Sequence, residues 1–221
     1  MKKISLYIII CIIIILLRNN ICFFISNIFG VFKLDNNYYE GIIKLKDEEI
    51  KYLNNEIDNI NEFSKKLPRI KYNYKVSKII YKESYNIGKY KVQYGKKDKV
   101  SIGSAVMNEY GLIGKITKVD ESTSELTTLK NLKDISVVIN GIYGKLNYDY
   151  KNNKYVVTDI SNYDKVYINN EVYTSGYGTI KENIYIGKVI KVENDTISKK
   201  VYIDINDNYD NLNYLIIVGD F

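Results

Sequence analysis

The amino-acid sequence predicts a mainly β protein with a long helical N-terminal segment. Three observations support this class. Residues 70–221 form short apolar runs separated by Gly, Asn and Asp, a spacing typical of a β-sandwich or of barrels. Residues 33–67 contain no proline and repeat apolar residues with a heptad period, which indicates a helix. Residues 4–32 are dominated by apolar residues, as in a membrane-spanning helix. The predicted segments are therefore 1–32, 33–68 and 69–221.

Composition excludes several kinds of chemistry. The 221-residue chain has no histidine and two cysteines, and Cys11 and Cys22 both lie in the apolar N-terminal segment. Histidine-dependent nucleophilic catalysis, histidine-ligated metals and cysteine-based zinc sites are thereby excluded from residues 69–221. We expect no enzymatic activity, no cofactor, and no catalytic or metal-binding residues.

The net charge of +6 is spread along the chain. Its densest basic cluster, Lys96-Lys97-Asp98-Lys99, is predicted to be a solvated turn, with an anionic cell-wall polymer or a membrane surface as a minor partner. Nucleic acid is not expected as a partner, because the charges of either sign are interspersed.

Residues 1–32 are predicted to form a membrane anchor. Lys2 and Lys3 precede an apolar run over residues 4–17, Arg18 interrupts it, and residues 21–32 resume it. A helix over residues 4–25 would be about 33 Å long, enough for a hydrocarbon core of roughly 30 Å. Arg18 would then snorkel to the nearer headgroups. No small-residue cleavage site follows, so we expect an uncleaved single-pass anchor rather than a signal peptide. The leading lysines favour a cytoplasmic N-terminus, with the rest of the chain extracytoplasmic.

The segment over residues 33–68 is predicted to be a coiled-coil helix that ends at Pro68. With Ile43 at position a, apolar residues fill most a and d positions, and Ile at a with Leu at d favours a parallel dimer. The alternative is an amphipathic helix that packs on its own domain. The expected dimer interface consists of Ile43, Ile50, Leu53, Ile57, Ile60 and Leu67.

Eight strands are expected in the third segment, at residues 75–81, 90–94, 112–119, 135–139, 155–158, 184–192, 201–205 and 214–218. Four Asn-rich turns are expected between them, at 140–141, 152–153, 169–170 and 206–208, since Asn tolerates left-handed backbone.

Two glycine-punctuated motifs make this outline specific. The first extends from Gly103 to Ile116 and contains the sequence GLIGK, with Gly111 and Gly114. The second is TSGYG, formed by Thr174, Ser175, Gly176, Tyr177 and Gly178, followed by IGKV with Gly187. In this order the motifs resemble those of the rod shape-determining protein MreC family. Asn169 and Asn170 stand where that family usually has Gly-Asp.

The resemblance implies two β-barrel-like subdomains, arranged as in chymotrypsin-type proteases but without their catalytic residues. It also implies a homodimeric scaffold of cell elongation that maintains cell shape. Its implied partners are an MreD-like membrane protein, a class B penicillin-binding protein and a peptidoglycan polymerase, with MreB coupled indirectly. The alternative is a periplasmic-type adaptor of a secretion or efflux system, although such adaptors normally need a returning helix. Thr174 and Ser175 have no histidine base, so we expect the motif glycines and hydroxyls to shape turns.

Overall fold

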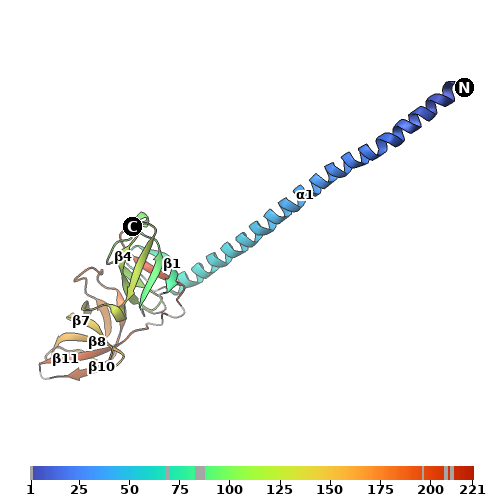
Figure 1. Cartoon of the computed structure of the whole chain (residues 1–221). Coiled ribbons are helices and arrows are strands. Elements are labelled where there is room, and N and C mark those ends of the chain that lie inside the picture. Colours follow the sequence, from blue (N-terminus) through green and yellow to red (C-terminus); the bar gives the residue numbers. More distant parts are fainter. Residues whose placement is uncertain (1, 68–69, 83–87, 196, 207–208, 210–211) are drawn as a thin grey trace. The chain divides into compact units, whose positions relative to one another are not determined.

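A computed structural model describes residues 2–67, 70–82, 88–195, 197–206, 209 and 212–221. The chain divides into two compact units, residues 1–58 and 59–221. Helix α1 (Lys2–Lys66) is drawn in blue to cyan in Figure 1 and includes both N-terminal segments expected from the sequence. Pro68, predicted to end the helix, lies outside the described residues.

Over the described residues, no helix has a stretch both long enough and apolar enough to cross a membrane. The membrane anchor at residues 1–32 stays a prediction.

The first barrel is a closed antiparallel sheet with the strand order β1-β12-β3-β4-β5-β2. It is closed at one side by β12, which pairs with both β1 and β3. The short 3₁₀ helix η1 (Lys96–Asp98) follows β2 and, with Lys99 after its end, forms the predicted basic turn. The strands are β1 (Tyr74–Lys82), β2 (Lys89–Gln93), β3 (Ala105–Met107), β4 (Leu112–Val119), β5 (Thr123–Thr128) and β12 (Tyr214–Val218).

The second barrel is also closed and has the order β10-β11-β8-β7-β6-β9. The 3₁₀ helix η2 (Leu129–Asn131) leads into it from β5. Tyr150 fixes this connection, because its hydroxyl donates to the Lys130 carbonyl over 2.8 Å. The strands are β6 (Ile135–Ile139), β7 (Ile142–Asp149), β8 (Lys154–Ser161), β9 (Glu171–Thr174), β10 (Tyr185–Asn194) and β11 (Ser198–Asp204).

Strand β12 is buried on both faces. Leu215 and Ile217 belong to the apolar cluster that fills the first barrel. Ile216 and Val218 belong to a larger cluster that also contains the interior of the second barrel. Because successive side chains of a strand point to opposite faces, one strand contributes to both cores. This explains why residues 215–218 are continuously apolar instead of alternating.

The structure confirms the mainly β class with two barrels, and every strand expected from the sequence is present. Of the four predicted Asn-rich turns, three contain a residue in the left-handed conformation, at Asn140, Asn153 and Asn169. In the fourth turn, residues 207–208 lie outside the described part of the chain. Four strands were missed, at β3, β5, β7 and β9. Strands β3 and β9 are short, and β5 carries five polar residues among its six.

Candidate functional site

The TSGYG motif forms the turn between β9 and β10, and Thr174 closes it. Thr174 is 1% exposed. Its Oγ1 donates to the Lys181 carbonyl over 2.6 Å and accepts from the Ile184 amide over 2.9 Å. A buried hydroxyl must satisfy its hydrogen-bonding capacity. These two bonds do so, and they join the two ends of the turn.

Ser175 uses its hydroxyl within the same turn. Its Oγ donates to Ser136 Oγ over 2.8 Å and accepts from the Tyr177 amide over 3.2 Å. The Ser175 amide also donates to the Ser136 carbonyl over 3.1 Å. These bonds tie the turn to β6, and they are those of a structural turn rather than of an activated nucleophile, which needs a base within hydrogen-bond reach.

The motif glycines sit where backbone is crowded. Gly176 has φ +79°, and a Cβ there would lie 2.9 Å from Glu182 Cβ. A Cβ at Gly114 would lie 2.3 Å from the Thr127 carbonyl oxygen, and one at Gly187 would lie 2.1 Å from that of Asp204. Gly178, by contrast, faces open space. Three of these four motif glycines are therefore required by close approach.

The two motifs meet at the junction between the barrels. Gly111 of the first barrel has φ +149°, and a Cβ there would lie 2.8 Å from the Tyr185 carbonyl oxygen of the second barrel. A Cβ at Gly103 would likewise lie 2.6 Å from Thr179 Cβ. Lys115 adds a long hydrogen bond of 3.5 Å to Thr179 Oγ1. The sequence predicted both motifs but not that they face each other.

The residues between the halves of the second motif strengthen this junction. Lys181 forms an ion pair with Asp220, and its Nζ lies 4.9 Å from the centre of the Tyr72 ring. The Tyr72 hydroxyl donates to the Glu182 carbonyl over 3.1 Å. The turn from the second barrel is thus held by Tyr72, which precedes β1, and by Asp220, which follows β12.

Two tyrosines beside the turn have raised pKa values. The Tyr173 hydroxyl donates to Glu171 over 2.6 Å, and this bond, with burial, raises the pKa of Tyr173 to about 12. Burial raises the pKa of Tyr185. Both side chains therefore stay protonated and uncharged at neutral pH.

The expected dimer residues fall into two groups. Side chains of the first group are 51–59% exposed; these are Ile43, Ile50, Leu53 and Ile57. Ile60 and Leu67 are half-buried. Leu67 packs with Phe63 against the larger core cluster, and the Phe63 ring lies 6.1 Å from that of Tyr214. The last turn of the helix thus packs on its own domain, and pairing of two chains stays a prediction.

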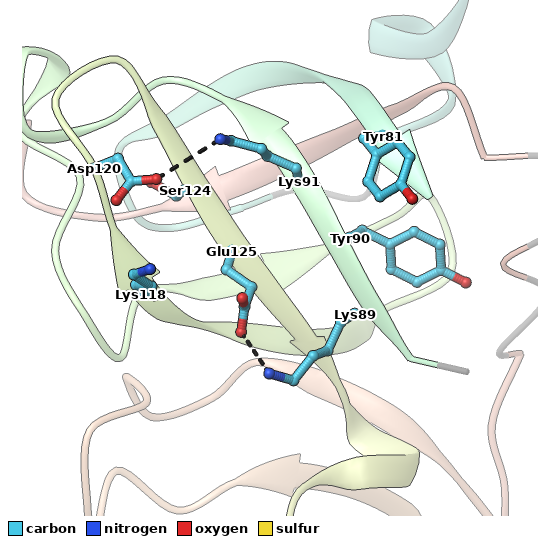
Figure 2. Close-up of a pocket in the computed structure, with 8 residues that line it drawn as sticks. All are labelled: Tyr81, Lys89, Tyr90, Lys91, Lys118, Asp120, Ser124 and Glu125. Atoms are coloured by element: carbon cyan, nitrogen blue, oxygen red, sulfur yellow. Dashed lines mark hydrogen bonds and ion pairs between the residues drawn. The ribbon is translucent and has the colours of Figure 1, made fainter. Parts of the chain in front are cut away.

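A groove on the first barrel was missed from the sequence. It is lined by residues of β1, β2, β4 and β5 and by Asp120 (Figure 2). Its lysines and carboxylates are spread over residues 89–125, and only strand register brings them together. The one available signal was that Lys89, Lys91 and Glu125 occupy alternate, outward positions of polar strands.

Among the described residues, no group of three or more Asp, Glu, His or Cys side chains could hold a metal ion.

Comparison with known proteins identifies the barrels. A family model described as rod shape-determining protein MreC, barrel core, matches residues 79–219. No curated protein sequence matches the chain.

Solved structures share its fold. MreC from Listeria monocytogenes has a TM-score of 0.61 and 22% identity, covering 80% of this chain and 97% of its own. MreC from Pseudomonas aeruginosa has a TM-score of 0.56 and 17% sequence identity, and the match covers 66% of this chain and 99% of that one. A chain in the complex between Penicillin-Binding Protein (PBP2) and MreC from Helicobacter pylori has a TM-score of 0.55 and 16% sequence identity. That match covers 68% of this chain and 100% of the other.

The family model matches more than half of the chain and runs through both barrels, including both glycine motifs. This chain belongs to the rod shape-determining protein MreC family.

Proposed function

We propose that this chain is a bitopic membrane scaffold of the cell-elongation machinery. Its N-terminus lies in the cytoplasm, residues 1–32 span the membrane, and both barrels lie outside. It maintains cell shape by coupling peptidoglycan synthesis to the MreB cytoskeleton. It acts by holding partners rather than by catalysis.

The family match over both barrels carries this proposal. The contacts across the barrel junction support it, because the Lys181–Asp220 ion pair and the hydrogen bond from Tyr72 to the Glu182 carbonyl fix the two barrels relative to each other. A scaffold needs such rigidity, because a binding surface that is already ordered loses little conformational entropy when a partner binds.

The proposed partners follow from the family. A relative in Helicobacter pylori forms a complex with PBP2, so we propose a class B penicillin-binding protein and its peptidoglycan polymerase as extracytoplasmic partners. We propose an MreD-like protein in the membrane, and self-association through the heptad residues of α1.

The test is depletion of the native shape gene in the host, followed by expression of this chain with an affinity tag after Phe221. We expect normal cell width, and recovery of the class B penicillin-binding protein from cross-linked membranes. The control is a chain in which residues 1–32 are replaced by a cleavable signal peptide, which should be exported but should not restore shape. If cell shape is restored but the penicillin-binding protein is not recovered, the proposal that it is a partner is contradicted. A folded, exported chain that leaves cells misshapen would contradict the cell-shape role.

A further inference from the structure

A row of side chains crosses the outer face of the first barrel. Strand register places Tyr81 opposite Lys91, Lys91 opposite Glu125, and Glu125 opposite Lys118. Residues directly opposite each other point to the same face of a sheet. Because neighbouring strands are about 4.8 Å apart, a row over four strands is about 14 Å long. The row therefore joins an aromatic ring at one end to a cation at the other.

This row forms the floor of a groove of about 230 Å³ (Figure 2). The Tyr81 side chain at one end is 59% exposed. Tyr90 lies beside it and packs against the core of the barrel, so it forms a supported wall. A ligand can therefore lay an apolar face on an open ring without any rearrangement of the core.

The charges of the groove leave one cation in excess, because three lysines face two carboxylates. Lys89 pairs with Glu125 over 2.9 Å, and Lys91 lies 3.7 Å from Asp120. Lys118 is exposed, and no ion pair joins it to any carboxylate in the described part of the chain. The end of the row opposite Tyr81 is thus suited to an anionic group.

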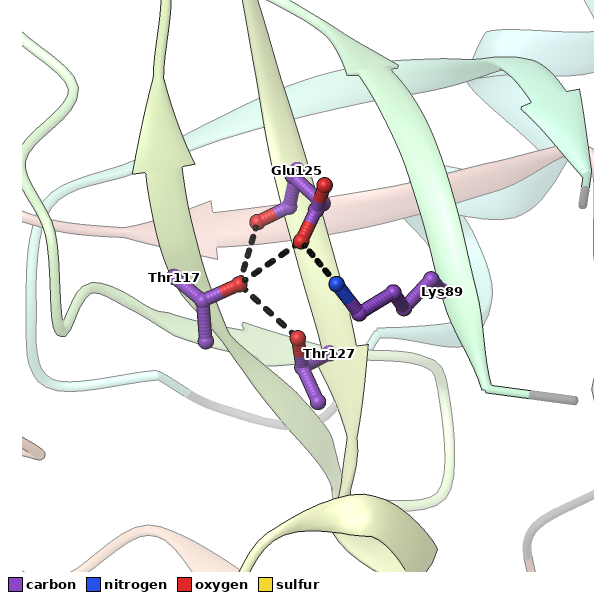
Figure 3. Close-up of polar contacts among 4 residues, drawn as sticks. All are labelled: Lys89, Thr117, Glu125 and Thr127. Carbon is purple, nitrogen blue, oxygen red and sulfur yellow. Dashed lines mark hydrogen bonds and ion pairs between the residues drawn. The ribbon is translucent and has the colours of Figure 1, made fainter. Parts of the chain in front are cut away.

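Side chains of neighbouring strands hold Glu125 in place. Thr117 Oγ1 lies 2.8 Å from Thr127 Oγ1 and 3.4 Å from Glu125 Oε1, and Lys89 contacts the same carboxylate oxygen (Figure 3). An acceptor fixed in this way costs little ordering when a ligand binds. The groove therefore offers a preorganised acceptor next to lysine donors.

The closed sheet restricts what can bind. All six strands of this barrel are paired on both sides, so an extended peptide cannot join the sheet as an added strand. Recognition must come from side chains. A set that combines an open ring, carboxylate acceptors, lysine donors and a surplus cation matches a ligand that has hydroxyl groups, a flat apolar face and an acidic group.

We propose that this groove binds an acidic saccharide. One sugar ring lies on Tyr81, sugar hydroxyls donate to Glu125 and Asp120, and the acidic group bonds to Lys118 and Lys91. Carboxylate and phosphate meet the lysines in the same way. This site goes beyond the proposed scaffold function and does not depend on it.

The test is titration calorimetry of the full chain in detergent with four probes. The disaccharide of N-acetylglucosamine and N-acetylmuramic acid carries a carboxylate, glucose 6-phosphate carries a phosphate, and diacetylchitobiose is a neutral saccharide. The fourth probe is a short acidic peptide with tyrosine. We expect binding of at least one acidic saccharide, with affinity about tenfold above that for chitobiose, as for one charge-assisted hydrogen bond. The tighter of the two acidic saccharides identifies the acidic group.

Variants locate the site. Tyr81→Ala and Lys118→Met should each weaken binding about five- to tenfold. The matched controls are Tyr167→Ala, at a side chain 60% exposed on the second barrel, and Lys188→Met, at an exposed lysine of β10; neither should change it. Thermal melts establish that all four variants fold. The proposal is overturned if neither acidic saccharide binds, if the peptide binds more tightly, or if the control variants weaken binding as much.

Discussion

Thr174 and Ser175 are adjacent hydroxyls with different tasks in one turn. Thr174 faces inward and closes the turn on Lys181 and Ile184, whereas Ser175 ties the same turn to Ser136 on a neighbouring strand. Removal of a buried hydroxyl leaves the partner groups unsatisfied, which costs about 1–3 kcal/mol. At the residue scale, therefore, Thr174 contributes more to stability than Ser175.

Two substitutions separate structure from chemistry in this turn. Ser175→Ala should change the free energy of unfolding by no more than about 1 kcal/mol and should leave cell shape normal. Gly176→Val should cost more than about 2 kcal/mol, because a β-branched residue resists its positive φ and the Cβ would meet Glu182. Urea denaturation and cell width in the depleted host measure both effects.

The matched control is Gly141→Val. Gly141 has φ +81°, close to that of Gly176, but nothing lies near a Cβ there. If Gly141→Val is as destabilising as Gly176→Val, strain alone explains the effect and contact with Glu182 does not. A well-folded Ser175→Ala chain that fails to restore shape would contradict the scaffold proposal.

At the scale of elements, periodicity predicted the structure well where an element is buried on one side. Strand β6, with alternating Ile135, Val137 and Ile139 in the core, was predicted at its observed bounds. Strand β5 was missed because its buried positions include Ser124, Thr127 and Thr128, which resemble a loop in sequence. The groove could not be located from the sequence, since pairing register, rather than local sequence, brings Lys91, Glu125 and Lys118 together.

The exposed part of the heptad pattern in α1 predicts a dimer. Burial of each apolar side chain is worth roughly 1.5–3 kcal/mol, so the double variant Ile50→Glu, Ile57→Glu should prevent pairing. Analytical ultracentrifugation of residues 35–221 measures this. Asn55→Glu, Asn59→Glu is the control: it adds the same charge off the a and d positions and should leave the dimer intact. A parent fragment that is monomeric at high micromolar concentration would refute pairing of the isolated region, although anchors would raise the local concentration in a membrane.

At the scale of the whole molecule, the junction makes two barrels act as one body. Ile216 and Val218 of the first barrel share a core cluster with the second barrel, and Gly111 brings the two backbones together. The resemblance to a known family predicted two barrels, but a single sequence could not show which residues face each other across them. The local pattern of apolar and polar residues carries no information on the distance between segments that are far apart in the chain.

Gly111→Ala should loosen this junction. The added Cβ would meet the Tyr185 carbonyl oxygen, and the cost should be about 1–3 kcal/mol. Hydrogen exchange should quicken on both facing segments, near residues 103–111 and 176–185. Gly178→Ala is the control, because it also has positive φ but open space around it, and its exchange should quicken only locally. Faster exchange confined to the first barrel in Gly111→Ala would contradict a coupled junction.

The proposed membrane topology gives a further prediction. Lys2, Lys3 and the apolar run that follows them predict an N-terminus in the cytoplasm and Phe221 outside. A reporter that is active only in the cytoplasm should therefore be inactive when fused after Phe221, and the mature N-terminus should be intact. Strong reporter activity, or a mature chain that begins beyond residue 20, would refute the uncleaved anchor.

The position of β12 sets an order for making the protein. The six strands of the second barrel are contiguous between residues 135 and 204, whereas the first barrel needs β12 between β1 and β3. As the chain is synthesised, the barrel that begins first is thus completed last, after residues 214–218 have emerged. A chain that stops short of them has unpaired edges on β1 and β3, which favour aggregation. Closure of the first barrel therefore reports that translation has passed Val218.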